Sequence, residues 1–165
     1  LKSLCLGPQI TSTMTDIGFA QIAKLNCLHT FEIHNAISVS TIAFKTFFAR
    51  PSSINLRKIS LYKCPSVDTT VIRQISESCI ELEKFTLEKS KACKSNRDFE
   101  DIVKFTQNCQ RLRRLHLFGM HIIIAEALHL IPKYLPELIS LKYSNSDKPM
   151  KIPTCFFAFV TRKNA

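Results

Sequence analysis

The chain has 165 residues, a length that fits a single domain. Its 45% hydrophobic content excludes an intrinsically disordered chain, and no apolar stretch is long enough to cross a bilayer or to resemble a secretory signal. The formal net charge of +10 favours acidic partners, namely nucleic acid, an acidic or phosphorylated peptide, or an anionic membrane, although a basic surface also serves solubility alone. No membrane partner is expected.

A short pattern of three large apolar residues, spaced three and then two positions apart, occurs six times. The copies are Leu1-Leu4-Leu6, Leu28-Phe31-Ile33, Leu56-Ile59-Leu61, Leu82-Phe85-Leu87, Leu112-Leu115-Leu117 and Leu138-Leu141-Tyr143. Apolar and polar residues alternate in each copy, which predicts a half-buried strand. Successive copies begin 26 to 30 residues apart, and this period predicts a repeat array.

The segments between the copies carry apolar residues at helical spacing. After Leu56–Leu61, Pro65 is expected to end the strand, Asp68 to cap a helix, and Ser78-Cys79 to close it. The expected apolar helix faces are Phe19, Ile22 and Ala23; Ile42, Phe44, Phe47 and Phe48; Val71, Ile72 and Ile75; Phe99, Ile102, Val103 and Phe105; and residues 122–130. This alternation predicts an α/β fold with a parallel sheet.

Three of the seven cysteines stand at recurring points of the pattern. Cys64 follows a strand, and Cys79 and Cys109 each precede the next leucine by three residues. The odd number of cysteines and the lack of a CxxC pair argue against a disulfide framework or a zinc site. We expect reduced, buried cysteines that serve packing, as is typical of a cytoplasmic or nuclear protein.

The extended pattern L-x-x-L-x-L-x-x-C resembles the cysteine-containing class of leucine-rich repeat. It is carried by Leu56-Ile59-Leu61-Cys64, by Cys79 and Cys109, and by the helix opening Met14-Thr15-Asp16-Ile17-Gly18-Phe19. The resemblance implies a right-handed leucine-rich repeat solenoid, a horseshoe with parallel strands on its concave face and helices on its convex face. Residues 1–149 would form the repeats, and residues 150–165 a C-terminal cap or partial repeat.

Proteins with this repeat class are most often F-box proteins. The resemblance therefore implies the substrate-binding region of a receptor in an SCF-type ubiquitin ligase, whose F-box docks on the SCF adaptor. No F-box is present in these residues, and because the chain opens at Leu1 inside a motif copy we expect a piece of a longer protein. A repeat scaffold without ubiquitin coupling remains an alternative, as does a weak binder of nucleic acid or acidic ligands. No nucleic-acid-binding motif accompanies the basic charge.

Partner binding is expected on the concave face, where positions two and four after the first leucine point away from the helices. Lys58, Lys84 and Arg114 would form a cationic ladder roughly 10 Å long there, suited to phosphate or carboxylate groups. The alternative is that these residues are simply solvated, and the basic loop 88–97 is a secondary candidate. The expected partner-binding residues are Lys58, Lys84, Arg114, His116, Lys142, Glu32, Tyr62 and Phe118.

No set of residues with catalytic spacing accompanies these features. Cys109 and His116 are seven residues apart but are expected on opposite sides of a strand, which argues against a nucleophile and base pair. The three glycines do not cluster, so no phosphate-binding loop is expected. The sequence therefore predicts a non-enzymatic interaction module without a cofactor or a metal.

Overall fold

The computed structural model describes residues 1–88, 96–119, 131 and 133–144, with the backbone alone for residues 96–99, 143 and 144. Its six strands form one all-parallel sheet in which the spatial order follows the chain order. The strands are β1 (Ser3–Leu6), β2 (Thr30–His34), β3 (Lys58–Tyr62), β4 (Lys84–Glu88), β5 (Arg114–Phe118) and β6 (Ser140–Ser144). Each motif copy falls on one strand, so the six strand predictions are confirmed.

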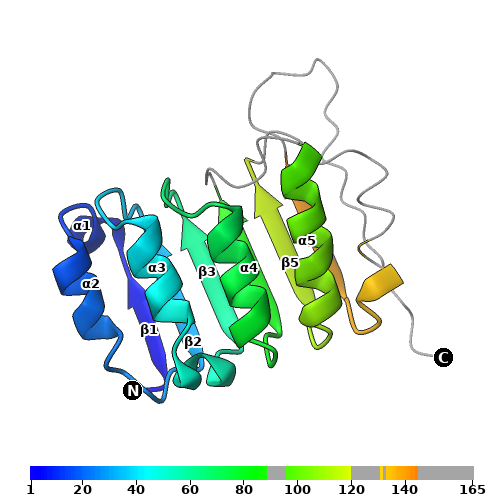
Figure 1. The fold of residues 1–165 in the computed structure, drawn as a ribbon, viewed down its shortest axis with the longest axis horizontal. Coiled ribbons are helices and arrows are strands. Elements are labelled where there is room, and N and C mark those ends of the chain that lie inside the picture. Colours follow the sequence, from blue (N-terminus) through cyan, green and yellow to red (C-terminus); the bar gives the residue numbers. More distant parts are fainter. Residues whose placement is uncertain (89–95, 120–130, 132, 145–165) are drawn as a thin grey trace.

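Helices join the strands and cover one side of the sheet. They are α1 (Pro8–Thr11), α2 (Asp16–Ile22), α3 (Thr41–Phe48), the 3₁₀ helix η1 (Pro51–Asn55), α4 (Thr69–Ser78) and α5 (Asn96–Asn108). Figure 1 shows α2, α3, α4 and α5 side by side in front of the sheet. The predicted α/β class is therefore confirmed. We call the opposite side of the sheet, which carries residues 30, 32 and 34 and their register partners, the open face.

The backbone geometry recurs from strand to strand. The carbonyl of Arg57, one residue after the first leucine of its copy, accepts hydrogen bonds from the amides of Glu83 (2.8 Å) and Lys84 (2.9 Å) of the next copy. The corresponding carbonyls of Lys2, His29, Glu83 and Arg113 do the same. Seven residues after the first leucine, Asn35, Lys63 and Gly119 all have positive φ angles of 56°, 51° and 70°. Neighbouring copies thus repeat the same backbone hydrogen bonds, and three of them also share the turn that follows the strand.

The core lies between the sheet and the helices. The middle residue of each motif copy is a direct register partner of the next, from Leu4 through Phe31, Ile59, Phe85 and Leu115 to Leu141. At the amino-terminal end the core is aromatic, with ring centroids 4.5 to 6.2 Å apart among Phe19, Phe31, Phe44, Phe47 and Phe48. Farther along, aliphatic residues replace most of these rings. Burial of this apolar surface is the main stabilising contribution.

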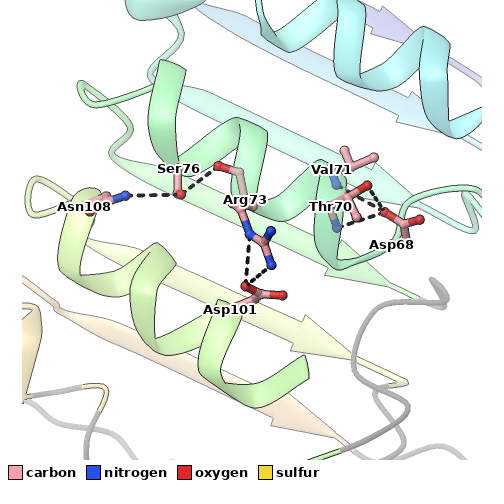
Figure 2. Close-up of polar contacts among 7 residues, drawn as sticks. All are labelled: Asp68, Thr70, Val71, Arg73, Ser76, Asp101 and Asn108. Atoms are coloured by element: carbon pink, nitrogen blue, oxygen red, sulfur yellow. Dashed lines mark hydrogen bonds and ion pairs between the residues drawn. The ribbon is translucent and has the colours of Figure 1, made fainter. Parts of the chain in front are cut away.

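Helix α4 begins and ends where the sequence predicts. Asp68 accepts hydrogen bonds at Oδ1 from the amides of Thr70 (2.9 Å) and Val71 (3.2 Å), as Figure 2 shows. These bonds satisfy two amides that the first helical turn leaves without partners. Cys79 is the C-cap, and its carbonyl then accepts the amide of Leu82 at the start of the next strand segment. The predicted cap and closing residues are confirmed.

Two predictions about burial are wrong. Ile42 was expected on the apolar face of its helix but is 76% exposed. It precedes Phe44 by two residues, which places it about 200° around the helix axis from that buried ring. Cys5 and Cys27 are exposed because they do not occupy the recurring cysteine points of the pattern.

The cysteines at the recurring points are buried, as predicted. Cys64, Cys79 and Cys109 are free thiols without measurable exposure. Burial raises the pKa of Cys64 to about 11 and that of Cys109 to about 12. Both thiols therefore stay protonated near neutral pH, which fits a packing role.

Three predicted features lie wholly or mostly outside the described residues. These are the helix over residues 122–130, the cap over residues 150–165 and most of the loop 88–97. Within the described ranges, no helix is both long enough and apolar enough to cross a membrane.

Candidate partner-binding face

The predicted cationic ladder occupies the first positions of three adjacent strands. Lys58 is the direct register partner of Lys84, and Lys84 is the direct partner of Arg114. Lys58 and Arg114 are exposed, and Lys84 is partly exposed. Among the described residues, no carboxylate forms an ion pair with any of the three. The ladder therefore presents three unpaired positive charges on the open face.

A small pocket opens beside the ladder. It has a volume of about 110 Å³ and is lined by Lys58, Glu83, Lys84, Arg113, Arg114 and Ile139. Small-molecule sites usually exceed about 300 Å³, so this pocket fits a single anionic group better than a metabolite. Its one carboxylate, Glu83, already contacts Arg57 at 3.4 Å. The lining thus has a clear positive excess.

His116 and Lys142 extend the positive region toward β6, where they are direct register partners. Partial burial, followed by the positive charges of Lys142, Lys84 and Arg114, lowers the pKa of His116 to about 4. The imidazole is therefore neutral near pH 7 and contacts Ser140 Oγ through Nε2 at 3.1 Å. Within this region it supplies a hydrogen-bonding group and no charge of its own.

Phe118 lies two residues after His116 on the same strand and the same face. The ring centroids of these two residues are 6.0 Å apart. Phe118 is partly exposed, so it offers apolar surface beside the cations. A partner segment with both acidic and apolar side chains would find both kinds of contact here.

The remaining predicted residues lie toward the β1 edge. Tyr62 stacks on His34, with ring centroids 4.3 Å apart and an interplanar angle of 16°. His34 Nε2 lies 2.8 Å from Glu32 Oε1. Partial burial acts to raise the pKa of Glu32, but hydrogen bonds with His34 and Cys5 and the charges of His34 and Lys84 bring that pKa below its ordinary value. Glu32 is therefore ionised and already has partners.

The eight predicted residues thus fall into two groups on one face. One contains the cations Lys58, Lys84, Arg114 and Lys142, with the neutral His116 and Phe118 beside them. The other contains Glu32 and Tyr62, together with His34 and Cys5. Cys5, Glu32 and His34 each offer one potential metal-ligand atom, and these three atoms lie within 4.8 Å of one another.

Sequence reasoning missed Glu83 and Arg113 as pocket residues. The available signal is their position, since each immediately precedes a ladder residue at the start of a strand. The sequence-based prediction also overestimated how exposed the open face is at its central strands. Ser60 and Thr86 are 4% and 2% exposed, because short side chains in central strands lie below their longer neighbours. Thr86 Oγ1 has no hydrogen-bond partner within the described part of the chain.

Comparison with protein-family models finds no match for this chain, and comparison with curated proteins finds none either.

Proposed function

We propose that residues 1–149 form a leucine-rich repeat module that binds an acidic or phosphorylated segment of a protein partner on its open face. The repeat proposal is supported by six motif copies on successive parallel strands and by the recurring hydrogen bonds between copies. In a solenoid of this kind the open face is the concave wall, where such modules bind their partners. The region 150–165 is its proposed cap.

One observation carries the binding proposal, namely the direct register of three like charges. Side chains directly opposite each other on neighbouring strands interact closely, and like charges there are destabilising. Lys58, Lys84 and Arg114 take this unfavourable arrangement, and no carboxylate of the described ranges forms an ion pair with them. A bound phosphate or carboxylate would remove the repulsion, and arginine adds the geometry for two parallel hydrogen bonds.

The whole-protein role that we propose is that of a substrate receptor in an SCF-type ubiquitin ligase. This part rests on the resemblance to the cysteine-containing repeat class. It requires an F-box elsewhere in the full-length protein. Affinity purification of that protein from cells should recover the SCF adaptor. Purification without the adaptor would favour a scaffold that is not coupled to ubiquitin transfer.

The binding proposal is tested by fluorescence anisotropy with two fluorescein-labelled acidic peptides. One peptide is phosphorylated on serine and the other is not. The double charge reversal Lys84→Glu and Arg114→Glu should weaken peptide binding by at least about 100-fold, because the two lost charge-assisted bonds contribute about 1.5 to 3 kcal/mol each. Thermal stability should not fall, since both residues lie outside the core.

A matched control changes net charge by the same amount on the helix side. Lys45 on α3 and Lys104 on α5 are both exposed. The double variant Lys45→Glu and Lys104→Glu should bind the peptides within about twofold of the wild type once long-range attraction is screened by salt. Equal losses in the two double variants would refute a specific ladder site. Tighter binding of a single-stranded oligonucleotide of equal charge would favour the nucleic-acid alternative.

A further inference from the structure

A second group of side chains on the open face has no role in the proposed anion site. Cys5 on β1 is the direct register partner of Glu32 on β2. His34 follows Glu32 by two residues, so the two side chains leave the strand on the same side. We call Cys5, Glu32 and His34 the donor cluster. It gathers a thiol, a carboxylate and an imidazole from two hydrogen-bonded strands.

The atoms of the donor cluster are already close to the spacing of a metal site. Cys5 Sγ lies 3.4 Å from Glu32 Oε1, and His34 Nε2 lies 2.8 Å from the same oxygen. All three atoms lie within 4.8 Å of one another. Around a tetrahedral zinc ion, such ligand atoms would be about 3.4 to 3.6 Å apart. The sulfur–oxygen pair already has this spacing, and the nitrogen–oxygen pair must open by less than about one ångström.

The surroundings hold the imidazole in place. The His34 ring stacks on Tyr62, with an interplanar angle of 16°, while its Nε2 points at Glu32. Contacts that orient a ligating histidine in this way strengthen metal sites. The ligand positions also belong to paired strands and not to a loop, which favours a fixed geometry.

We propose that Cys5, Glu32 and His34 form a three-ligand site for a zinc ion, with the fourth position open to water or to a group of the bound partner. The mixed sulfur, nitrogen and oxygen set suits a borderline cation such as Zn²⁺, whereas Mg²⁺ and Ca²⁺ prefer oxygen alone. The open fourth position distinguishes the site from a closed structural zinc site. A search for CxxC pairs cannot find this site, because Cys5 and Glu32 lie 27 residues apart in the sequence and meet only as register partners on β1 and β2.

The Cys5 thiol is not activated in the metal-free protein. Local desolvation and the neighbouring Glu32 raise the pKa of Cys5. The thiol is therefore protonated in the metal-free protein and must release its proton to bind zinc. The same raised pKa argues against Cys5 as an activated nucleophile, since reactive cysteines have lowered values.

The experiment titrates the chelator-treated full chain with Co²⁺ as a spectroscopic probe and then displaces the probe with Zn²⁺. We expect one Co²⁺ per chain with a sulfur-to-cobalt charge-transfer band. Cys5→Ser should abolish the band, and Cys5→Ser or His34→Gln should weaken Zn²⁺ binding at least about tenfold, as expected when a ligand is removed. Because Cys5 is exposed, the Ser variant should keep its circular dichroism spectrum.

Cys27→Ser is the matched control. Cys27 is also exposed and also has a histidine nearby, His29, whose Nδ1 lies 3.0 Å from the Cys27 carbonyl. This variant should retain the band and the affinity of the wild type. Absence of the band in the wild type, or its persistence in Cys5→Ser, would overturn the zinc site and leave a hydrogen-bonded cluster only. The ladder variant Lys84→Glu and Arg114→Glu should still bind Co²⁺, so the two proposals can fail separately.

Discussion

The charged side chains on the two sides of the sheet differ in whether they form ion pairs. On the helix side, Arg73 of α4 donates from Nε and Nη2 to Asp101 Oδ1 of α5, at 3.2 and 2.8 Å. Figure 2 shows this pair together with the bond from Asn108 to Ser76 Oγ, 3.3 Å long, which joins the same two helices. On the open face, Lys58, Lys84 and Arg114 are register partners of one another, and none of them forms an ion pair with a carboxylate in the part of the chain that the structure describes.

This difference separates charges that hold the fold from charges that are available for a ligand. The Asp101 side chain is 9% exposed, so its carboxylate depends on Arg73 for compensation of its burial. The ladder residues lie at the surface, where water compensates them and where they contribute nothing favourable to folding. Charge on the helix side should therefore matter for stability, and charge on the open face for binding.

The largest expected effect comes from the core between the sheet and the helices. Phe47 packs with its ring centroid 5.2, 4.5 and 5.1 Å from those of Phe19, Phe31 and Phe48. Phe47→Ala should lower the free energy of unfolding by about 3 to 5 kcal/mol, through lost burial and the cavity left behind. Urea denaturation measures this loss.

The control for this change lies on the same helix. Ile42 is 76% exposed, so Ile42→Ala should change the free energy of unfolding by less than about 0.5 kcal/mol. Comparable losses for the two variants would show that α3 does not pack as described. If Phe47→Ala lowered the free energy of unfolding less than a surface charge variant does, burial in the core would not be the main contribution to stability.

A smaller effect is expected from the helix-side pair. Asp101→Asn keeps the shape of the side chain but removes its charge, which weakens the two bonds from Arg73. We expect the melting temperature to fall by a few degrees, while peptide binding on the open face stays unchanged. Differential scanning fluorimetry and anisotropy measure the two quantities.

Glu100→Gln tests whether loss of negative charge alone explains such a fall. Glu100 is the exposed neighbour of Asp101 on α5. Its substitution should shift the melting temperature less than Asp101→Asn does, because exposed charges contribute little to stability. An equal shift in both variants would remove the distinction between the two sides of the sheet.

The fold was predictable because its pattern is local and repeated. Each L-x-x-L-x-L segment alternates apolar and polar residues, and this period can bury one side of a strand. The cap at Asp68 was also predictable, since a short acidic side chain before an apolar helical face is a common helix start. The prediction for Ile42 is wrong because it groups this residue with Phe44 by hydrophobicity alone. A spacing of two residues puts Ile42 on the side of the helix opposite Phe44.

For the candidate site, the sequence predicts only which residues become neighbours on adjacent strands. Equal positions in neighbouring copies must become neighbours in a parallel sheet, so the ladder followed from the repeat. The pocket beside it depends on how Glu83 and Arg113 leave the strand starts, which no period encodes. The donor cluster depends on side-chain rotamers and on the stacking of His34 with Tyr62. Such contacts depend on how side chains of neighbouring strands pack, and sequence spacing does not predict them.

At neutral pH the smallest expected effect on stability is that of His116, whose titration reports on its burial and on the charges of the open face. Its folded-state pKa of about 4 lies below the ordinary value of 6.5, first because of burial and then because of Lys142, Lys84 and Arg114. Above pH 6.5 the ring is neutral in both the folded and unfolded states and adds no pH dependence. Between pH 6.5 and 4 the unfolded chain binds the proton more readily, so the free energy of unfolding falls as the pH falls. His116→Gln should flatten that slope.

The same ring should also sense a bound anion. A phosphopeptide on the ladder would offset the nearby positive charge, so the pKa of His116 followed by NMR should rise in its presence. Removing one cation with Lys142→Gln should raise this pKa in the same direction without any peptide, whereas Lys45→Gln on the helix side should leave it unchanged. A His116 pKa that moves with neither the peptide nor Lys142→Gln would mean that burial alone sets it. The open face would then lack the concentrated positive charge that distinguishes it from the helix side.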